Sequence, residues 1–293
     1  MRNRPPETAV LCAACRLLVS MKYRIDDFMD ALWRCPEISA VVLRDPLFQM
    51  LGTSSAALGP DGIDWLEAVG RDPATDDDLW LAGRSAAGSA DKQLLYSIAP
   101  SSFTRLVLPS GTDGAEYRQV MADDLALAEI DPALVIGGTY QRGWAFRSDH
   151  ELDLINAKAA AAAPGRDTAY VRVGKLPLYV AVEGKNRVRA FRAAGKRIIA
   201  FTGLARFPDP GALELHETTD SSGTGTPEVA VSDAGSGAVR VLALPAVTVP
   251  VLEAHGVRWG RTLPPDAVDD GGRALDAARR AVLEDLVRHF MHP

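Results

Sequence analysis

The sequence predicts a domain in the middle of the chain that contains both helices and strands. Its class is α/β in the broad sense (α+β), with a mixed sheet and helices packed on it. Strand and helix patterns alternate between residues 115 and 207, with turn-forming residues between them. Residues 1–114 carry mostly helical spacing, whereas residues 208–293 carry the pattern of a β-hairpin followed by an amphipathic helix. We therefore expect three regions with these boundaries, the outer two flanking the central domain.

The composition is that of an ordinary folded protein with an excess of acidic residues. Hydrophobic residues make up 47% of the 293 residues, and the formal net charge is -6. Because phosphate neutralisation supplies most nucleic-acid affinity, this charge argues against a protein that coats nucleic acid with its whole surface. Arg16 interrupts the apolar run near the N-terminus, and no run reaches the roughly 20 residues of a membrane helix. We expect a cytoplasmic protein without a membrane partner. The sequence is compatible with either a monomer or a homo-oligomer.

The first region is expected to be helical, with one strand near its end. Apolar residues at helical spacing predict helices over Thr8–Met21, Ile25–Trp33, Val41–Leu51 and Asp61–Val69. Phe103–Leu108 has the composition of a strand and precedes a loop of turn formers. Cys12 and Cys15 have the C-x-x-C spacing of zinc and redox sites, but the sequence has no second pair for a four-ligand zinc site. We expect both cysteines to pack on a helix.

The central region has the order strand, helix, strand, strand, helix, strand. The strands are predicted over Leu125–Ile130, Tyr170–Val173, Leu178–Val182 and Arg197–Phe201. A capping box of Ser148 and Glu151 opens the first helix, which extends to Ala163. The second helix covers Asn186–Ala194 and ends at Gly195.

The last region is expected to add a hairpin, a further strand and a terminal helix. The hairpin strands are Glu228–Ser232 and Ala238–Leu244, with turn-forming residues between them. Val247–Leu252 is rich in β-branched residues and predicts the further strand. Arg273–Met291 carries apolar residues on one helical face.

One segment combines a strand end, a tight turn and a helix start with several cations. The strand ends near Glu183, and Gly184 permits a close backbone approach at the turn. The amides of a first helical turn and the helix dipole favour an anion there. Lys185 and Arg187 add cationic donors, and a guanidinium group suits bidentate contact with phosphate. Glu183 is suited to hold a basic side chain, a sugar hydroxyl or a metal ion. The sequence therefore predicts an anion site here.

Basic residues recur along one face of the same predicted helix. Lys185, Arg189, Arg192 and Lys196 are separated by four, three and four positions. Such a stripe can lie along a nucleic-acid backbone or an acidic partner. A solvated face of a surface helix carries the same pattern, so both interpretations stay open.

These residues resemble two sequence boxes of the ParB/sulfiredoxin superfamily. Glu183–Ala190, followed by Ala193–Gly195, is similar to the second box of ParB-like domains, commonly G-E-R-R-x-R-A with an A-x-x-x-G helix end. Leu127–Pro132 with Gln141-Arg142 is similar to the first box, where a strand leads through an I-x-P-like turn to Q-P-R. The resemblance covers residues 123–202, and the order of elements between the boxes also fits.

The resemblance implies a nucleotide-binding protein. In ParB-like relatives the second box binds the triphosphate of CTP, and in other members, including sulfiredoxins and free-serine kinases, it binds ATP. By resemblance, the phosphate contacts come from Gly184, Lys185, Asn186, Arg187 and Arg189. Gln141 and Arg142 would approach the nucleotide from the facing loop, Mg²⁺ would accompany the triphosphate, and Glu183 would be the catalytic acid/base. The implied enzyme is a nucleotide hydrolase or a phosphotransferase.

Two other functions stay open at this level. A DNA-associated protein, such as a ParB-like nuclease or a mobile-element regulator, would use the basic stripe of Lys185, Arg189, Arg192 and Lys196. A non-catalytic interaction module would keep the fold without the ligand. No cysteine lies near the Gly184 turn, which argues against sulfiredoxin activity.

Overall fold

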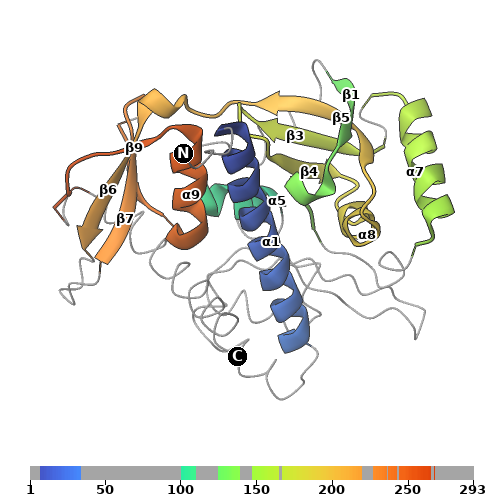
Figure 1. Cartoon of the computed structure of the whole chain (residues 1–293), viewed down its shortest axis with the longest axis horizontal. Helices are drawn as coiled ribbons and strands as arrows, with labels where there is room; N and C mark the ends of the chain where they lie inside the picture. The colour runs from blue at the N-terminus through green and yellow to red at the C-terminus, as the bar shows by residue number, and fades with distance from the viewer. Residues whose placement is uncertain are drawn as a thin grey trace, which may run out of the picture.

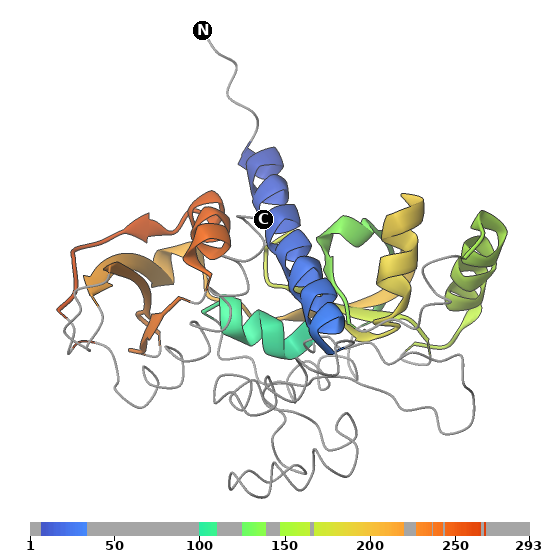
Figure 2. The same ribbon diagram turned by 90° about the horizontal axis from the view of Figure 1, so that it is seen from below.

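The computed structural model describes most of the central region and parts of the two outer regions. The described residues are 7–33, 100–109, 125–138, 147–164, 167–219, 227–235, 237–242, 244–264 and 267. The predictions for Val41–Leu51, Asp61–Val69, Arg273–Met291, Gln141 and Arg142 lie outside them. Figures 1 and 2 show two sheets toward opposite ends of the molecule, with the long helix α1 between them.

The larger sheet is mixed and has five strands in the order β1-β5-β3-β4-β2. The strands are β1 (Ala126–Ile130), β2 (Val135–Ile136), β3 (Ala169–Val173), β4 (Tyr179–Glu183) and β5 (Ile198–Ala205). β2 is parallel to β4 and β3 is parallel to β5, whereas β1 and β5, like β3 and β4, are antiparallel. The four predicted strands of the central region are confirmed, with β5 longer than expected and β2 added. The α+β class is also confirmed.

The two helices of the central region begin and end near the predicted residues. α7 (Asp149–Ala161) is preceded by Ser148, whose hydroxyl accepts the Glu151 amide proton, while the Glu151 carboxylate accepts from the Ser148 amide. α8 (Arg187–Ala194) ends at Gly195, which is left-handed with a φ of 63°. The capping box and the glycine stop are therefore confirmed.

One hydrophobic core joins α1 to the larger sheet and to the C-terminal part. It contains Leu18 of α1 (Glu7–Trp33), Phe103 of α5 (Pro100–Val107) and Val251 of α9 (Pro245–His255), together with residues of the sheet and of α8. α1 packs against α9 (Figure 1). Described residues of all three predicted regions therefore share one core.

The N-terminal helix is continuous where the sequence analysis expected two helices. The polar residues Lys22, Tyr23 and Arg24 separate the two predicted apolar segments. The side chains of Lys22 and Tyr23 are buried in α1, and Lys22 pairs with Asp26 one turn later. Asp26 for Lys22, and the Gly137 amide for Tyr23, thus replace the water that would otherwise hydrogen-bond to these polar groups.

Two segments predicted as strands are helices. Phe103–Leu108 lies mostly in α5, whose apolar residues Phe103 and Val107 are buried at helical spacing. Val247–Leu252 lies in α9, where Val247 and Val251 are likewise buried one turn apart. Both predictions followed the β-propensity of the residues, and packing in the core overrides that propensity. A proline at the start of each helix, Pro100 or Pro245, is the signal that favoured a helix.

The smaller sheet has four strands in the order β8-β7-β6-β9. These strands are β6 (Leu213–Thr219), β7 (Pro227–Asp233), β8 (Val239–Val241) and β9 (Arg258–Trp259). β7 and β8 form the predicted antiparallel hairpin. β6 and β9 are additions to it, and β6 pairs with both β7 and β9.

Adjacent leucines of α1 test whether this helix belongs to the common core. Leu18 is fully buried, whereas Leu17 is 50% exposed. We expect Leu18→Ala to lower the free energy of unfolding by about 2–5 kcal/mol, because the cavity cannot fully collapse, and Leu17→Ala to change it by about 0.5 kcal/mol or less. Urea unfolding followed by fluorescence and circular dichroism measures both. Equal effects of the two substitutions would contradict the packing of α1.

Candidate functional site

The turn after β4 has a left-handed residue at Gly184. Its φ is +73°, and a Cβ atom there would lie 3.0 Å from Thr168 Cγ2. The Gly184 carbonyl accepts the Arg187 amide proton at 3.0 Å, which closes the turn into α8. The predicted sequence of strand, glycine turn and helix is therefore confirmed. Lys185, Asn186 and Arg187 are half-buried in it.

The turn lies beside the end of β2, where the chain leaves the sheet toward Gln141 and Arg142. Because β2 and β4 are parallel neighbours, both leave the sheet at the same edge. The Gly138 amide donates to the Lys185 carbonyl at 3.4 Å, and a Cβ atom on Gly137 would lie 3.0 Å from that carbonyl oxygen. Gln141 and Arg142 follow shortly after Gly138, beyond the described residues. The fold thus brings the segment after β2 into direct contact with the Gly184 turn.

Arg187 is held against the beginning of β3. β3 is antiparallel to β4 with Ala169 opposite Glu183, so Asp167 and Thr168 lie beside the turn. Nη1 of Arg187 donates to the Asp167 carboxylate and to the Thr168 hydroxyl. A guanidinium group has five N–H donors. Nη2 and Nε of Arg187 consequently stay unused among the described residues.

The Asp167 carboxylate is ionised in this arrangement. Burial raises the pKa of Asp167, but hydrogen bonds from Arg187 and Thr168 outweigh burial and hold the pKa below its ordinary value. The carboxylate side chain is only 4% exposed. Asp167 therefore fixes the position of Arg187 at neutral pH.

A buried hydroxyl group without a partner belongs to the same surroundings. Tyr170 of β3 is fully buried, and its hydroxyl has no hydrogen-bond partner among the described residues. Burial raises the pKa of Tyr170, and the charges of Arg187 and Asp167 also act on it. The hydroxyl thus keeps its proton as a donor. Leaving such a group unpaired costs about 1–3 kcal/mol.

Tyr23 of α1 connects the end of β2 to α8. Its buried hydroxyl accepts the Gly137 amide proton at 3.1 Å and faces the Val135 carbonyl at 3.5 Å. The guanidinium carbon of Arg192 lies 4.4 Å from the centre of the Tyr23 ring, and that of Arg189 lies 5.5 Å from it. These are cation–π distances. One side chain thus holds both the β2 loop and the helix that follows the Gly184 turn.

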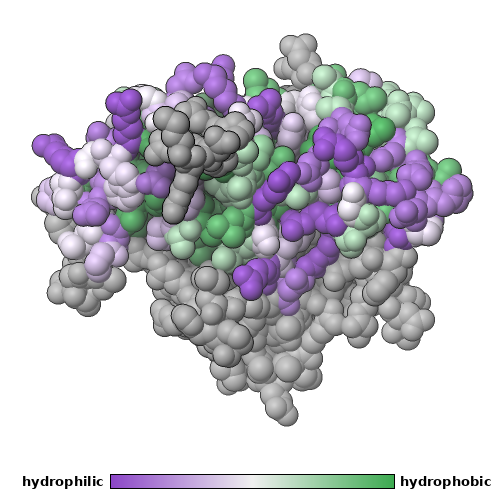
Figure 3. All heavy atoms as spheres, in the orientation of Figure 1, coloured by the Kyte–Doolittle hydropathy of each residue, from purple (hydrophilic) through white to green (hydrophobic). Residues whose placement is uncertain are grey.

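The predicted basic stripe is covered in part by α1. Arg189 forms an ion pair with Asp27, and Nη1 of Arg192 is buried beside the Tyr23 ring. Burial lowers the pKa of the neighbouring Lys22, which pairs with Asp26. Figure 3 shows hydrophilic side chains gathered over α1 and α8 on this face. Arg189 and Arg192 are therefore contacts between helices, and the interpretation of the stripe as a solvated face is corrected.

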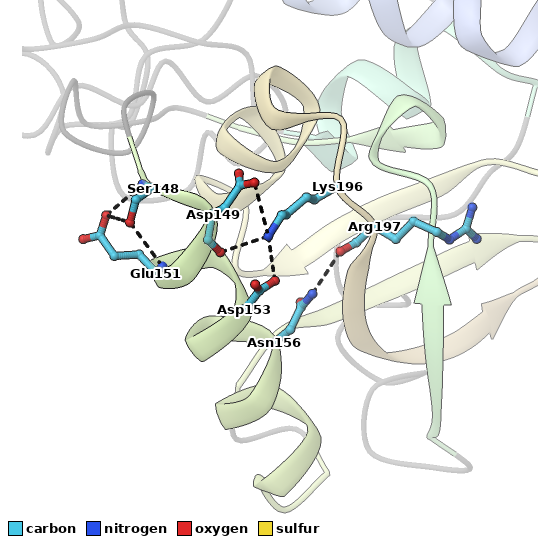
Figure 4. Close-up of polar contacts among 7 residues, drawn as sticks. All are labelled: Ser148, Asp149, Glu151, Asp153, Asn156, Lys196 and Arg197. Atoms are coloured by element: carbon cyan, nitrogen blue, oxygen red, sulfur yellow. Dashed lines mark hydrogen bonds and ion pairs between the residues drawn. The ribbon is translucent and has the colours of Figure 1, made fainter.

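Lys196 contacts the other neighbouring helix, α7 (Figure 4). Its Nζ lies 2.7 Å from the Asp153 carboxylate and donates to the Asp149 carbonyl at 3.0 Å. The Asn156 side chain donates to the Arg197 carbonyl at 3.0 Å, which ties α7 to the beginning of β5. α8 thus lies between α1 and α7 (Figures 1 and 2), with acidic residues on both sides.

The sequence analysis did not identify three residues of this site, Tyr23, Asp167 and Thr168. The predicted strands nevertheless contained a signal for the last two. Tyr23 comes from a distant helix, and no local signal identifies it. Asp167 and Thr168 lie just before the predicted strand Tyr170–Val173. Antiparallel pairing of that strand with the next one, Leu178–Val182, places both residues opposite the Gly184 turn. Glu183, the proposed acid/base, is exposed at the end of β4.

The described residues form no metal cage of their own. No group of three or more His, Cys, Asp or Glu side chains among them is arranged to hold a metal ion. Cys15 is fully buried with a free thiol, and burial raises its pKa to about 12. Cys12, half-buried, is also free. A neutral buried thiol is unreactive, which agrees with the expected packing role.

Comparisons with known proteins identify no relative. No protein-family model, no curated protein and no solved structure matches this chain. None of the helices that the structure describes is long and apolar enough to cross a bilayer. The likeness to ParB/sulfiredoxin proteins therefore consists of the resemblance of two segments of this chain to two sequence boxes of that superfamily.

Two left-handed glycines allow the constraint at the turn to be measured. Gly184→Ala places a Cβ atom 3.0 Å from Thr168, whereas Gly195, with a φ of +63°, has nothing within 4 Å of that position. We expect Gly195→Ala to cost about 1–2 kcal/mol from backbone strain alone, and Gly184→Ala to cost more. Urea unfolding of both variants gives the difference. A smaller cost at Gly184 would show that the turn is not packed as described.

Proposed function

We propose that this protein binds a nucleoside triphosphate, CTP or ATP, with the phosphates at the Gly184 turn. The observation that carries the proposal is the contact between Gly138 and Lys185, which joins the ends of two parallel strands. Ligands of α/β sheets commonly bind where parallel strands end and a helix begins. This contact joins the segment that leads to Gln141 and Arg142 with the Gly184 turn. From the sequence alone, only the family resemblance related these two segments.

The chemistry of the turn suits a phosphate group. Gly184 lets an oxygen approach the backbone, and the start of α8 directs its dipole toward an anion. Arg187 is oriented by Asp167 while Nη2 and Nε stay unused among the described residues, so it can bind phosphate without losing its anchor. The buried hydroxyl of Tyr170, on which the charge of Arg187 acts, is a further donor without a partner among the described residues.

The remaining proposed contacts lie around this turn. Lys185 and Asn186 belong to it, and Arg189 lies at the beginning of α8, where Asp27 would compete with a phosphate. Gln141 and Arg142 would contact the base or sugar from the loop after Gly138.

Hydrolysis or phosphotransfer would follow from Glu183. It is an exposed carboxylate at the end of β4, able to accept a proton from an attacking water or hydroxyl group. Mg²⁺ is usually held by one or two carboxylates and the substrate phosphates. Glu183 fits that limited role, so the metal ion would arrive with the nucleotide and neutralise its charge.

The contacts of the basic stripe do not favour DNA as the main partner. Arg189 and Lys196 pair with acidic residues of this chain, and Arg192 packs on Tyr23. DNA would have to displace these partners to gain the release of counterions that supplies its affinity. An interaction module without a ligand is the alternative that the following experiment separates.

Nucleotide binding and the role of Arg187 can be tested together. We expect CTP or ATP with Mg²⁺ to stabilise the protein by about 2.7 kcal/mol at one hundred times its Kd. Asp167→Asn keeps Arg187 and should bind. Adding Arg187→Ala to it should weaken binding roughly 10–100-fold, since a hydrogen bond to a charged group contributes about 1.5–3 kcal/mol. Thermal shift and calorimetry measure both.

The background substitution and a second arginine provide the controls. Asp167→Asn avoids leaving a buried carboxylate unpaired when Arg187 is removed. Arg197, which pairs with Glu129 and is 55% exposed, is the matched surface arginine, and Arg197→Ala should leave the Kd unchanged. GTP and inorganic triphosphate show whether the base matters. Absence of binding by all four compounds, or full binding without Arg187, would overturn the proposal.

A further inference from the structure

The smaller sheet carries a hydrogen-bonded serine and histidine away from the proposed nucleotide site. Nε2 of His216 on β6 lies 2.8 Å from Oγ of Ser232 on β7. The strands are antiparallel, with His216 opposite Ala230 and Ser232 opposite Glu214, so the two residues are diagonal neighbours on one face. Leu215 alternates with them toward the other face, where the apolar cluster lies.

The second ring nitrogen decides which group donates. Nδ1 of His216 lies 2.9 Å from the Arg261 carbonyl oxygen, which can only accept a hydrogen bond. Nδ1 therefore carries the proton of the neutral ring, and Nε2 presents a lone pair. Ser232 must donate its hydroxyl proton to Nε2. This is the arrangement in which a histidine removes the proton of a serine nucleophile, with a third group orienting the ring.

The surroundings hold the histidine ring in place and put a carboxylate beside it. His216 is only 3% exposed, so its ring is fixed, while Ser232 is half-buried and partly open to solvent. Oε2 of Glu214 lies 3.6 Å from Nε2 and would stabilise an imidazolium ion. Gly260 allows the chain to pass close by, since a Cβ atom there would lie 2.3 Å from the Glu214 carboxyl carbon.

We propose that Ser232 and His216 form a nucleophile and base pair that reacts with small carboxylic esters and with activated phosphonates. Oγ of Ser232 attacks the carbonyl carbon and its proton passes to Nε2. The ester C–O bond breaks, and the leaving alkoxide takes that proton from His216 to depart as an alcohol. Water then releases the acid from the acyl-serine by the same proton transfers. The pair is independent of the proposed nucleotide binding.

Labelling of the full chain with a fluorophosphonate tests the pair. Oγ forms a bond to phosphorus, the P–F bond breaks, and fluoride leaves as the proton moves to His216. Intact mass and peptide mapping should show one adduct, on Ser232, that Ser232→Ala abolishes. His216→Gln should slow labelling roughly 100-fold or more, because a general base contributes about 10²–10⁴-fold.

A second serine and a second nucleophile provide the controls. Ser148 also has a side-chain partner, the Glu151 carboxylate at 3.0 Å, but no histidine partner in the described part of the chain, so Ser148→Ala should leave the adduct unchanged. Ser232→Cys keeps His216 in place, and iodoacetamide should alkylate this thiol faster than Cys12. A folded chain without a Ser232 adduct, an undiminished rate in a folded His216→Gln variant, or a Ser232→Cys thiol no faster than Cys12 would overturn the proposal. The pair would then be a structural hydrogen bond.

Discussion

The candidate nucleotide site depends on the placement of one buried aromatic residue, Tyr23. Its hydroxyl satisfies the Gly137 amide at the end of β2, and its ring packs against Arg192 and Arg189 of α8. A buried amide without a hydrogen-bond partner destabilises the folded state, so this hydrogen bond fixes the position at which the chain leaves the sheet after β2. The ring packs against α8 and contacts the guanidinium groups of Arg189 and Arg192, which would otherwise face solvent. The N-terminal helix thereby becomes part of the site that the central region builds.

Acidic side chains of the same chain determine how an anion would meet this site. Asp167 holds Arg187, Asp27 pairs with Arg189, and Asp153 pairs with Lys196. A fixed arginine loses less conformational freedom when it binds a phosphate, which favours affinity. A carboxylate that shares the arginine also weakens the field felt by the phosphate. The two effects differ along α8, since Asp167 is buried and Asp27 is 58% exposed, so solvent screens the second pair more strongly.

The two candidate sites are built differently by the two sheets, for a simple geometric reason. In the larger sheet, parallel neighbours bring two loops to one edge, and backbone amides, a glycine turn and cations meet there. In the smaller sheet, antiparallel strands bring side chains together across their faces, so His216 and Ser232 meet without any loop. Arg261, which follows β9, completes the second arrangement through its carbonyl group.

Local signals in the sequence were sufficient for elements whose ends depend on backbone chemistry. The capping box at Ser148, the left-handed stop at Gly195 and the turn at Gly184 were all predicted, because each requires a particular residue for a local reason. Segments rich in β-branched residues were predicted less well. Val247–Leu252 is helical because burial of one face against the core outweighs a propensity of a few tenths of a kcal/mol per residue.

The sequence by itself determined the strand–glycine–helix unit at Gly184, since its residue types admit few other conformations. It also determined the alternating order of strands and helices in the central region. Only the tertiary structure decided what surrounds that unit. Asp167 reaches it through the pairing of β3 with the next strand, β4. Tyr23 and the end of β2 reach the same unit through helix packing and strand pairing over long sequence separations, and no local pattern encodes those contacts. For the same reason the charge on α8 could be predicted from sequence, whereas its acidic partners on α1 and α7 could not.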